Sequence, residues 1–129
     1  MFKFITVFGA RSFSVAGLRE DPHPSDTESY RFSFTVYSVS VDEFCKAIYA
    51  LHTNATDPEK YATYEDVVIK TSSMNDALRI TREGCCLYIT RGNLKVIYSG
   101  WISDMYKLCK QMEVDYITHI QPEDDNHNG

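Results

Sequence analysis

The chain has 129 residues, of which 43% are hydrophobic, and a formal net charge of −5. This length is enough for a hydrophobic core, and we expect one domain over residues 1–120. The negative charge disfavours non-specific binding to nucleic acid, so nucleic acid is not an expected partner. The polar, acidic residues 121–129 are typical of a disordered tail.

The first apolar segment, residues 2–8, alternates in the manner of a strand. It is not expected to be a signal peptide, because Arg11 ends the apolar run and no small-residue cleavage site follows. No run is long enough to span a bilayer, so a membrane is not an expected partner. The four cysteines form no disulfide pattern. Together these features predict a reduced, cytoplasmic protein.

The next segments predict a short strand over residues 12–15 and a long loop over residues 17–29, which is rich in proline and acidic residues. Residues 30–38 alternate again and predict a strand. The clearest helix start follows, where Ser40 and Glu43 match a capping box. The apolar positions that follow recur at helical spacing and predict a buried stripe: Val41, Phe44, Cys45, Ile48 and Leu51.

After a strand around residues 66–70, we expect a second helix over residues 73–83. Ser73 and Asp76 are typical of a helix start, and Gly84 is typical of a helix end. The apolar residues between them recur three and four positions apart.

Two β-rich segments, residues 85–90 and 94–99, then follow. The pair Gly92-Asn93 between them is favoured in hairpin loops. A third helix is expected from Ser103, because its apolar residues again recur at helical spacing. The alternation over residues 114–120 predicts a last strand.

This order of elements predicts an α+β fold. We expect a two-layer sandwich in which about three helices cover one face of a mixed or antiparallel sheet, with a ferredoxin-like core and additions. Apolar side chains point to both sides of the predicted strands. In residues 2–8, Ile5 and Val7 point to one side and the phenylalanines point to the other. Because one layer of helices covers only one face, a loop or a second subunit must cover the other.

No motif for catalysis, metal binding or nucleotide binding is present. The cysteines lack the paired spacing of zinc ligands, so no metal and no other cofactor are expected. The carboxylates of Glu65 and Asp66, adjacent on a strand, point to opposite faces and cannot act on one atom. A non-enzymatic role is therefore favoured over catalysis.

Residues 70–95 are locally basic within an acidic chain. A nucleotide-like ligand could bind through its phosphate at the start of the predicted second helix. The candidate ligand-binding residues are Lys70, Ser72, Ser73, Arg79 and Arg82. The same charges can also form a solvated surface with no ligand.

Aromatic residues give a second hypothesis. The chain has nine tyrosines, and tyrosine, tryptophan and arginine are enriched at binding hot spots. The candidate interface residues are Tyr88, Arg91, Tyr98, Trp101 and Tyr106. They predict self-association, binding to a protein target, or both.

In general character the chain resembles small accessory proteins of bacteriophages, which are compact, acidic and rich in tyrosine. The resemblance implies a protein that blocks a host protein or sequesters a signalling nucleotide. It covers no alignable stretch and assigns no residue a role. The sequence therefore predicts a small binding module acting through protein–protein contacts. The alternative is an oligomeric protein that binds, sequesters or cleaves a nucleotide-like molecule between subunits.

Overall fold

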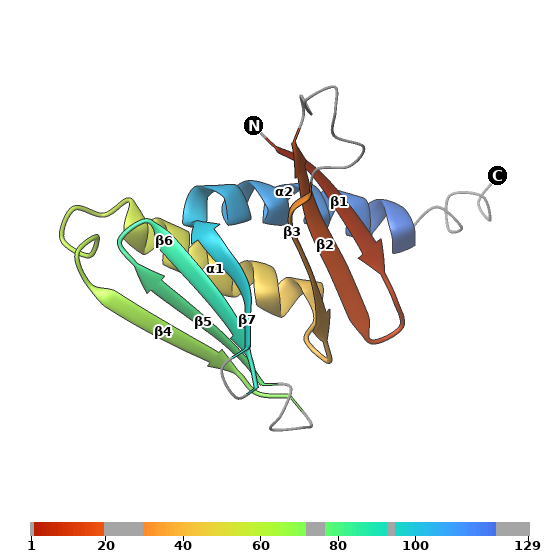
Figure 1. Cartoon of the computed structure of the whole chain (residues 1–129), viewed down its shortest axis with the longest axis horizontal. Coiled ribbons are helices and arrows are strands. Elements are labelled where there is room, and N and C mark those ends of the chain that lie inside the picture. Colours follow the sequence, from red (N-terminus) through yellow and green to blue (C-terminus); the bar gives the residue numbers. More distant parts are fainter. Residues whose placement is uncertain (1, 20–29, 72–76, 93–94, 121–129) are drawn as a thin grey trace.

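The computed structural model describes residues 2–19, 30–71, 77–92 and 95–120. These residues form seven strands and two helices (Figure 1). Their bounds are β1 (Phe2–Phe8), β2 (Ser12–Arg19), β3 (Tyr30–Tyr37), α1 (Val41–Ala55), β4 (Tyr64–Ile69), β5 (Leu78–Glu83), β6 (Cys86–Arg91), β7 (Lys95–Trp101) and α2 (Ile102–Ile120). The α+β class predicted from the sequence is confirmed.

The strands form two antiparallel sheets rather than one. Each sheet is a meander in which strands adjacent in sequence are paired, in the orders β1-β2-β3 and β4-β5-β6-β7. The last strand of each meander leads into a helix, β3 into α1 and β7 into α2. The sheets meet where β3 contacts β7. The chain therefore builds a meander followed by a helix twice.

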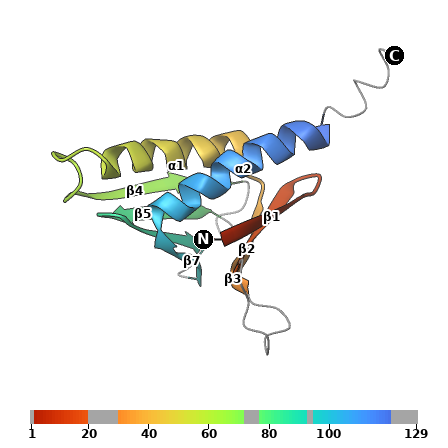
Figure 2. The same cartoon turned by 90° about the horizontal axis from the view of Figure 1, so that it is seen from above.

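The two helices lie antiparallel in one layer. Val41 at the start of α1 lies near Tyr116 in the last turns of α2. At the other end, the rings of Tyr49 and Tyr106 meet with centroids 5.5 Å apart. Figure 2 shows this helical layer above both sheets, so the two sheets share one covered side.

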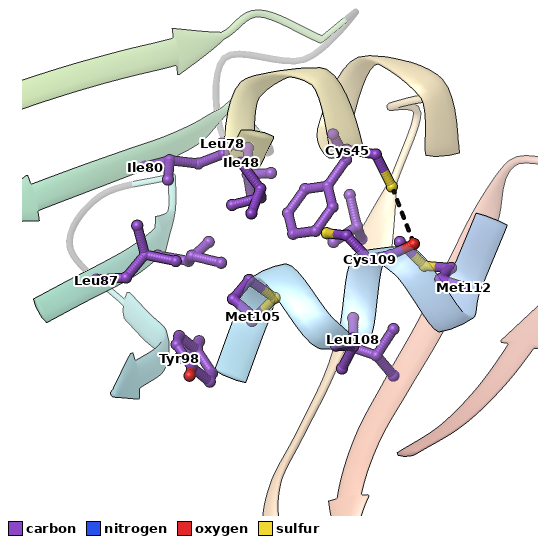
Figure 3. Packing of buried hydrophobic residues seen from close by; sticks show 14 of the residues in the cluster. Cys45, Ile48, Leu78, Ile80, Leu87, Tyr98, Met105, Leu108, Cys109 and Met112 are labelled. Atoms are coloured by element: carbon purple, nitrogen blue, oxygen red, sulfur yellow. Dashed lines mark hydrogen bonds between the residues drawn. The ribbon is translucent and has the colours of Figure 1, made fainter. Parts of the chain in front are cut away.

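The buried core lies between the helices and the covered sides of the sheets (Figure 3). Phe44 of α1 is fully buried, and its ring contacts Phe13 of β2 and Phe34 of β3. Ile80 and Leu87 reach the same core from the four-stranded sheet. One continuous cluster thus takes side chains from all the layers.

Helix α1 confirms the sequence prediction of its start and its buried face. The Glu43 backbone N–H donates to Ser40 Oγ over 3.0 Å, and the Ser40 N–H donates to a Glu43 carboxylate oxygen over 3.4 Å. This reciprocal pair is the expected capping box. The predicted stripe is buried as a whole.

The predicted helix over residues 73–83 is wrong for the described part of that range. Residues 78–83 form strand β5, where Leu78, Ile80 and Arg82 point inward in strict alternation. Pairing with both β4 and β6 satisfies the backbone of this segment on two sides. These tertiary contacts override the apolar spacing that suggested a helix. Residues 72–76, including the predicted cap, lie outside the described residues.

The predicted strand over residues 114–120 is also wrong, because α2 continues through Ile120. Side-chain contacts one helical turn apart extend along this end, from Gln111 to Asp115 and from Thr118 to the Val114 carbonyl. The described residues therefore contain two helices instead of three. Two separate antiparallel sheets do not match the predicted ferredoxin-like core.

Smaller differences concern the second strand and the tail. β2 extends to Arg19, beyond the predicted end at residue 15, and takes in the start of the predicted loop. The rest of that loop and residues 121–129 lie outside the described residues. In the described part of the chain, neither helix combines the length and the apolar composition needed to cross a membrane.

Candidate functional site

The side of the four-stranded sheet that faces away from the helices carries three rows of side chains. Strand pairing aligns residues across all four strands, and aligned residues point to the same side. The rows are Tyr64, Glu83, Cys86 and Trp101; Asp66, Thr81, Tyr88 and Ser99; and Val68, Arg79, Thr90 and Val96. We call this surface the outer face.

Large apolar side chains are exposed on the outer face. The exposed fractions are 64% for Tyr64, 45% for Val68, 38% for Tyr88, 56% for Val96 and 57% for Trp101. Figure 2 shows that both helices lie on the opposite side of this sheet. A group of exposed aromatic and aliphatic side chains on one face is typical of a protein-binding surface.

Two of the three charged side chains in the rows of the outer face form an ion pair, and the third is the exposed Glu83. The Arg79 guanidinium lies 3.3 Å from the Asp66 carboxylate, and the Thr81 hydroxyl donates to the same carboxylate over 3.1 Å. Such an exposed pair adds little to stability. It does leave the centre of the face close to neutral.

The predicted interface residues divide between this face and other places. Tyr88 and Trp101 lie on the outer face. Tyr98 lies in the core with 4% exposed, and its hydroxyl donates to the Trp101 carbonyl over 3.1 Å. Gly100 makes room for this contact, because a Cβ there would lie 2.7 Å from the Tyr98 hydroxyl. Tyr98 thus fixes the backbone that carries Trp101.

The other two predicted interface residues lie away from the outer face. The ring of Tyr106 stacks on His52 with centroids 4.0 Å apart, on the helical layer. The Arg91 guanidinium lies 5.2 Å from the centre of the Tyr37 ring, where the two sheets meet. Both contacts join separate elements of the chain, which is a structural role in itself.

The predicted ligand-binding residues are not brought together within the described part of the chain. Lys70 is exposed just after β4, and Arg79 pairs with Asp66. Arg82 points to the opposite side of the sheet and is fully buried. Ser72 and Ser73 lie outside the described residues.

Arg82 is the centre of a buried polar cluster. Its Nε donates to Glu65 over 2.8 Å, and its Nη2 pairs with the same carboxylate. The remaining N–H groups donate to the Thr63 hydroxyl and to backbone carbonyls, and Asn54 donates to Glu65 over 2.6 Å. All the hydrogen-bonding groups of this guanidinium are used. The cluster ties β5 to β4 and to the turn before β4.

The cysteines have structural surroundings. The Cys45 thiol donates to the Cys109 carbonyl over 3.9 Å, and burial raises the pKa of the Cys109 thiol. A buried thiol held neutral is a poor nucleophile. Cys85 lies 3.3 Å from the Tyr61 hydroxyl. Among the described residues, no group of three or more histidine, cysteine or acidic side chains could hold a metal ion.

Two hollows on the described part of the surface show no converging catalytic or ligand-binding groups. One of 360 Å³ lies between the start of α1 and the last turns of α2, lined by residues such as Val41, Glu113 and Ile117. Another of 240 Å³ lies over the three-stranded sheet beside Ile5, Val7 and Ser14. Both are open and shallow, unlike the enclosed sites that bind small ligands.

Three of the five exposed apolar residues of the outer face were not among the predicted interface residues, namely Tyr64, Val68 and Val96. Because residues 73–83 were predicted to be a helix, the predicted sheet lacked β5. Without β5 between them, the residues of β4 could not be aligned with those of β6. Alternation within β4 was the available signal, since Tyr64, Asp66 and Val68 fall on one side of a strand.

Comparison with protein families, with curated protein sequences and with solved structures found no match.

Proposed function

We propose that the protein is a non-enzymatic binding module that acts through protein–protein contacts on the outer face. The observation that carries this proposal is the set of five large apolar side chains exposed there. The fold itself needs apolar residues only on the side that packs against the helices. Exposed tyrosine and tryptophan on the other side have a cost in solubility that a binding role explains.

The partner that fits this face is a protein with an apolar and nearly uncharged surface. Tyr64, Tyr88 and Trp101 offer flat aromatic area and polar tips, which suit a protein contact. Asp66 and Arg79 pair with each other, which leaves one exposed negative charge, Glu83, at the edge of the rows. Blocking a target protein by covering part of its surface is the mode of action that the general resemblance to phage accessory proteins suggests.

A nucleotide-like ligand has less support. Binding a phosphate calls for free cationic or N–H donors, and Arg82 has none to spare, because all of its donors are used inside the protein. Arg79 is engaged with Asp66. Lys70 is the remaining described cation among the predicted ligand residues.

The test uses two matched double variants. Tyr88→Ser with Trp101→Ser removes two of the three aromatic side chains of the outer face and leaves Tyr64, and Ile5→Ser with Val7→Ser removes exposed apolar side chains from the three-stranded sheet. The wild-type chain, immobilised, captures its partner from an extract of the source cells. The purified partner is then titrated against each variant.

We expect the first variant to weaken binding at least about 100-fold, as loss of two hot-spot residues does, and the second to bind as wild type. If only the second variant binds more weakly, the binding site lies on the three-stranded sheet instead. Thermal stabilisation by a nucleotide that Lys70→Ala abolishes, with no protein partner, would replace the proposal by the ligand alternative.

A further inference from the structure

Strand β4 is a free edge of the four-stranded sheet. It pairs with β5 along all six residues, without a bulge, and no other described strand pairs with its second side. Figure 1 shows β4 at the margin of the molecule. Its sequence contains no proline, which natural edge strands often use to prevent further pairing.

The side chains of β4 are incompletely covered on both sides. Val68 is 45% exposed on the outer face, and Val67 and Ile69 are only partly buried against the core on the inner side. Of the other edge strands, β3 and β7 contact each other, and β1 contacts the last turns of α2, since Thr6 donates to Asp115 over 2.9 Å and the Phe8 ring packs edge-on against Tyr116. β4 contacts a helix near its start, where Glu65 accepts a hydrogen bond from Asn54 of α1 over 2.6 Å, whereas Asp66 and Val68 further along the strand are exposed.

The sequence of β4 is complementary to itself in one antiparallel register. Asp66 and Val68 lie on the outer face, and the exposed Lys70, directly after β4, continues the alternation in the sequence, so the order is acidic, apolar and basic. If Val68 lies opposite Val68 of a second copy, each Asp66 lies opposite the other copy's Lys70. Opposite charges placed across two strands in this way attract each other.

The neighbouring registers are worse. Centring the pair on Asp66 places two carboxylates opposite each other, and centring it on Val67 places each Asp66 opposite an apolar Val68. A shift by a single residue turns the outer face of one copy to the inner side of the other. The register centred on Val68 also places Val67 opposite Ile69 on the inner side, where both gain apolar contact.

We propose that two copies of this chain pair through β4, antiparallel, with Val68 opposite Val68. The result is one eight-stranded sheet with both outer faces on the same side. This inference is independent of the partner proposed above, because it uses the strand edge and leaves Tyr88 and Trp101 exposed. A dimer that presents two outer faces would also bind a two-site target more tightly than a monomer does.

Charge reversal tests the register. In Asp66→Lys, lysine faces lysine across the pair, and in Lys70→Asp, aspartate faces aspartate. Each variant alone should dimerise at least about 10-fold more weakly than wild type, by the coupling typical of close charge pairs. An equimolar mixture of the two should recover dimers, because every opposed pair is then of opposite charge.

Sedimentation velocity up to about 1 mM chain, the range of a weak dimer, measures these states, and urea unfolding confirms that both variants fold. A second measurement uses Val68→Cys, which should form a 68–68 disulfide under mild oxidation, while Val96→Cys on β7 should not. A monomeric wild type, or a mixture no more dimeric than its components, would overturn the proposal. Dimers that both charge variants retain would overturn it as well.

Discussion

The two sheets have the same plan and different outer surfaces. Each is an antiparallel meander that ends in a helix, and both bury one side under the same helical layer. Away from the helices, the middle of the three-stranded sheet carries small side chains such as Ser14, Ala16 and Ser33. The four-stranded sheet carries Tyr88 in its middle and Trp101 on its edge strand β7, whereas the three-stranded sheet exposes the aliphatic Ile5 and Val7 on its edge strand β1. Packing against the helices requires apolar side chains on the inner sides of both sheets. The outer sides lack this constraint, so their differences are the better guide to function.

The interiors of the two sheets also differ. The three-stranded sheet is held by aromatic packing around Phe44. The four-stranded sheet contains a buried arginine, Arg82, whose hydrogen bonds replace apolar contacts at the end nearest Glu65 and the turn before β4. The following predictions test this contrast, beginning with the largest expected effect.

Arg82→Met should lower the free energy of unfolding by about 3 kcal/mol, because the partly exposed Glu65 carboxylate loses its ion pair and several backbone carbonyls lose their donor. Urea unfolding measures the loss. Arg79→Met is the matched control on the same strand, and its exposed pair with Asp66 should cost less than about 1 kcal/mol. Equal losses in the two variants would show that the buried cluster is not the support of this sheet.

Gly17→Ala should destabilise the three-stranded sheet by about 1–3 kcal/mol, the usual cost of overpacking. A Cβ at this position would overlap the Phe32 ring. Adding Phe32→Leu should recover part of the loss, because a smaller side chain vacates the space. If the double variant is less stable than the sum of the single changes predicts, the close contact is not the cause.

Alkaline pH should destabilise the protein through Tyr98 of β7 and Cys109 of α2. Burial raises the pKa of both groups above their ordinary values of 10.0 and 9.0. Their stabilising contribution is complete below those ordinary values, and it is lost as pH rises from there toward the raised pKa. Urea midpoints measured between pH 8 and pH 11 should fall, and the fall should be smaller in Tyr98→Phe. An unchanged slope in that variant would exclude Tyr98 as a cause.

The smallest effects are expected at the junction between β3 and α1. Ser38 has a φ of 61°, in the left-handed region that favours glycine. Ser38→Gly should raise stability by up to about 1 kcal/mol. Ser40→Ala, two residues away, should lower it by about 1 kcal/mol through loss of the helix cap. Thermal unfolding of the two variants measures this difference in sign.

Local signals predicted α1 well, because its capping box and its apolar stripe agree. The segment containing β5 was misread because Leu78 and Thr81 also fit helical spacing, and only pairing with β4 and β6 decides between the two readings. The end of α2 was misread for the converse reason. The alternation over residues 114–120 indicated a strand, but the helix continues to Ile120.

The candidate site was predictable only in part. Composition indicated an interface at aromatic residues near β6 and β7, and two of these residues, Tyr88 and Trp101, lie on the same face of the sheet. Burial of Tyr98 and Arg82 could not be read from the chain, since alternation fixes a side only after the register of the whole sheet is known. Predicting each strand separately from the sequence does not show how the residues of neighbouring strands align.

Trp101 allows the most direct test of the central claim, that the outer face is the binding surface. It is the only tryptophan of the chain and is 57% exposed on that face. Acrylamide quenching of its fluorescence should fall several-fold when a saturating, tryptophan-free segment of the captured partner is added. It should stay unchanged when the chain dimerises through β4. Binding that leaves Trp101 fully accessible to acrylamide would contradict the account.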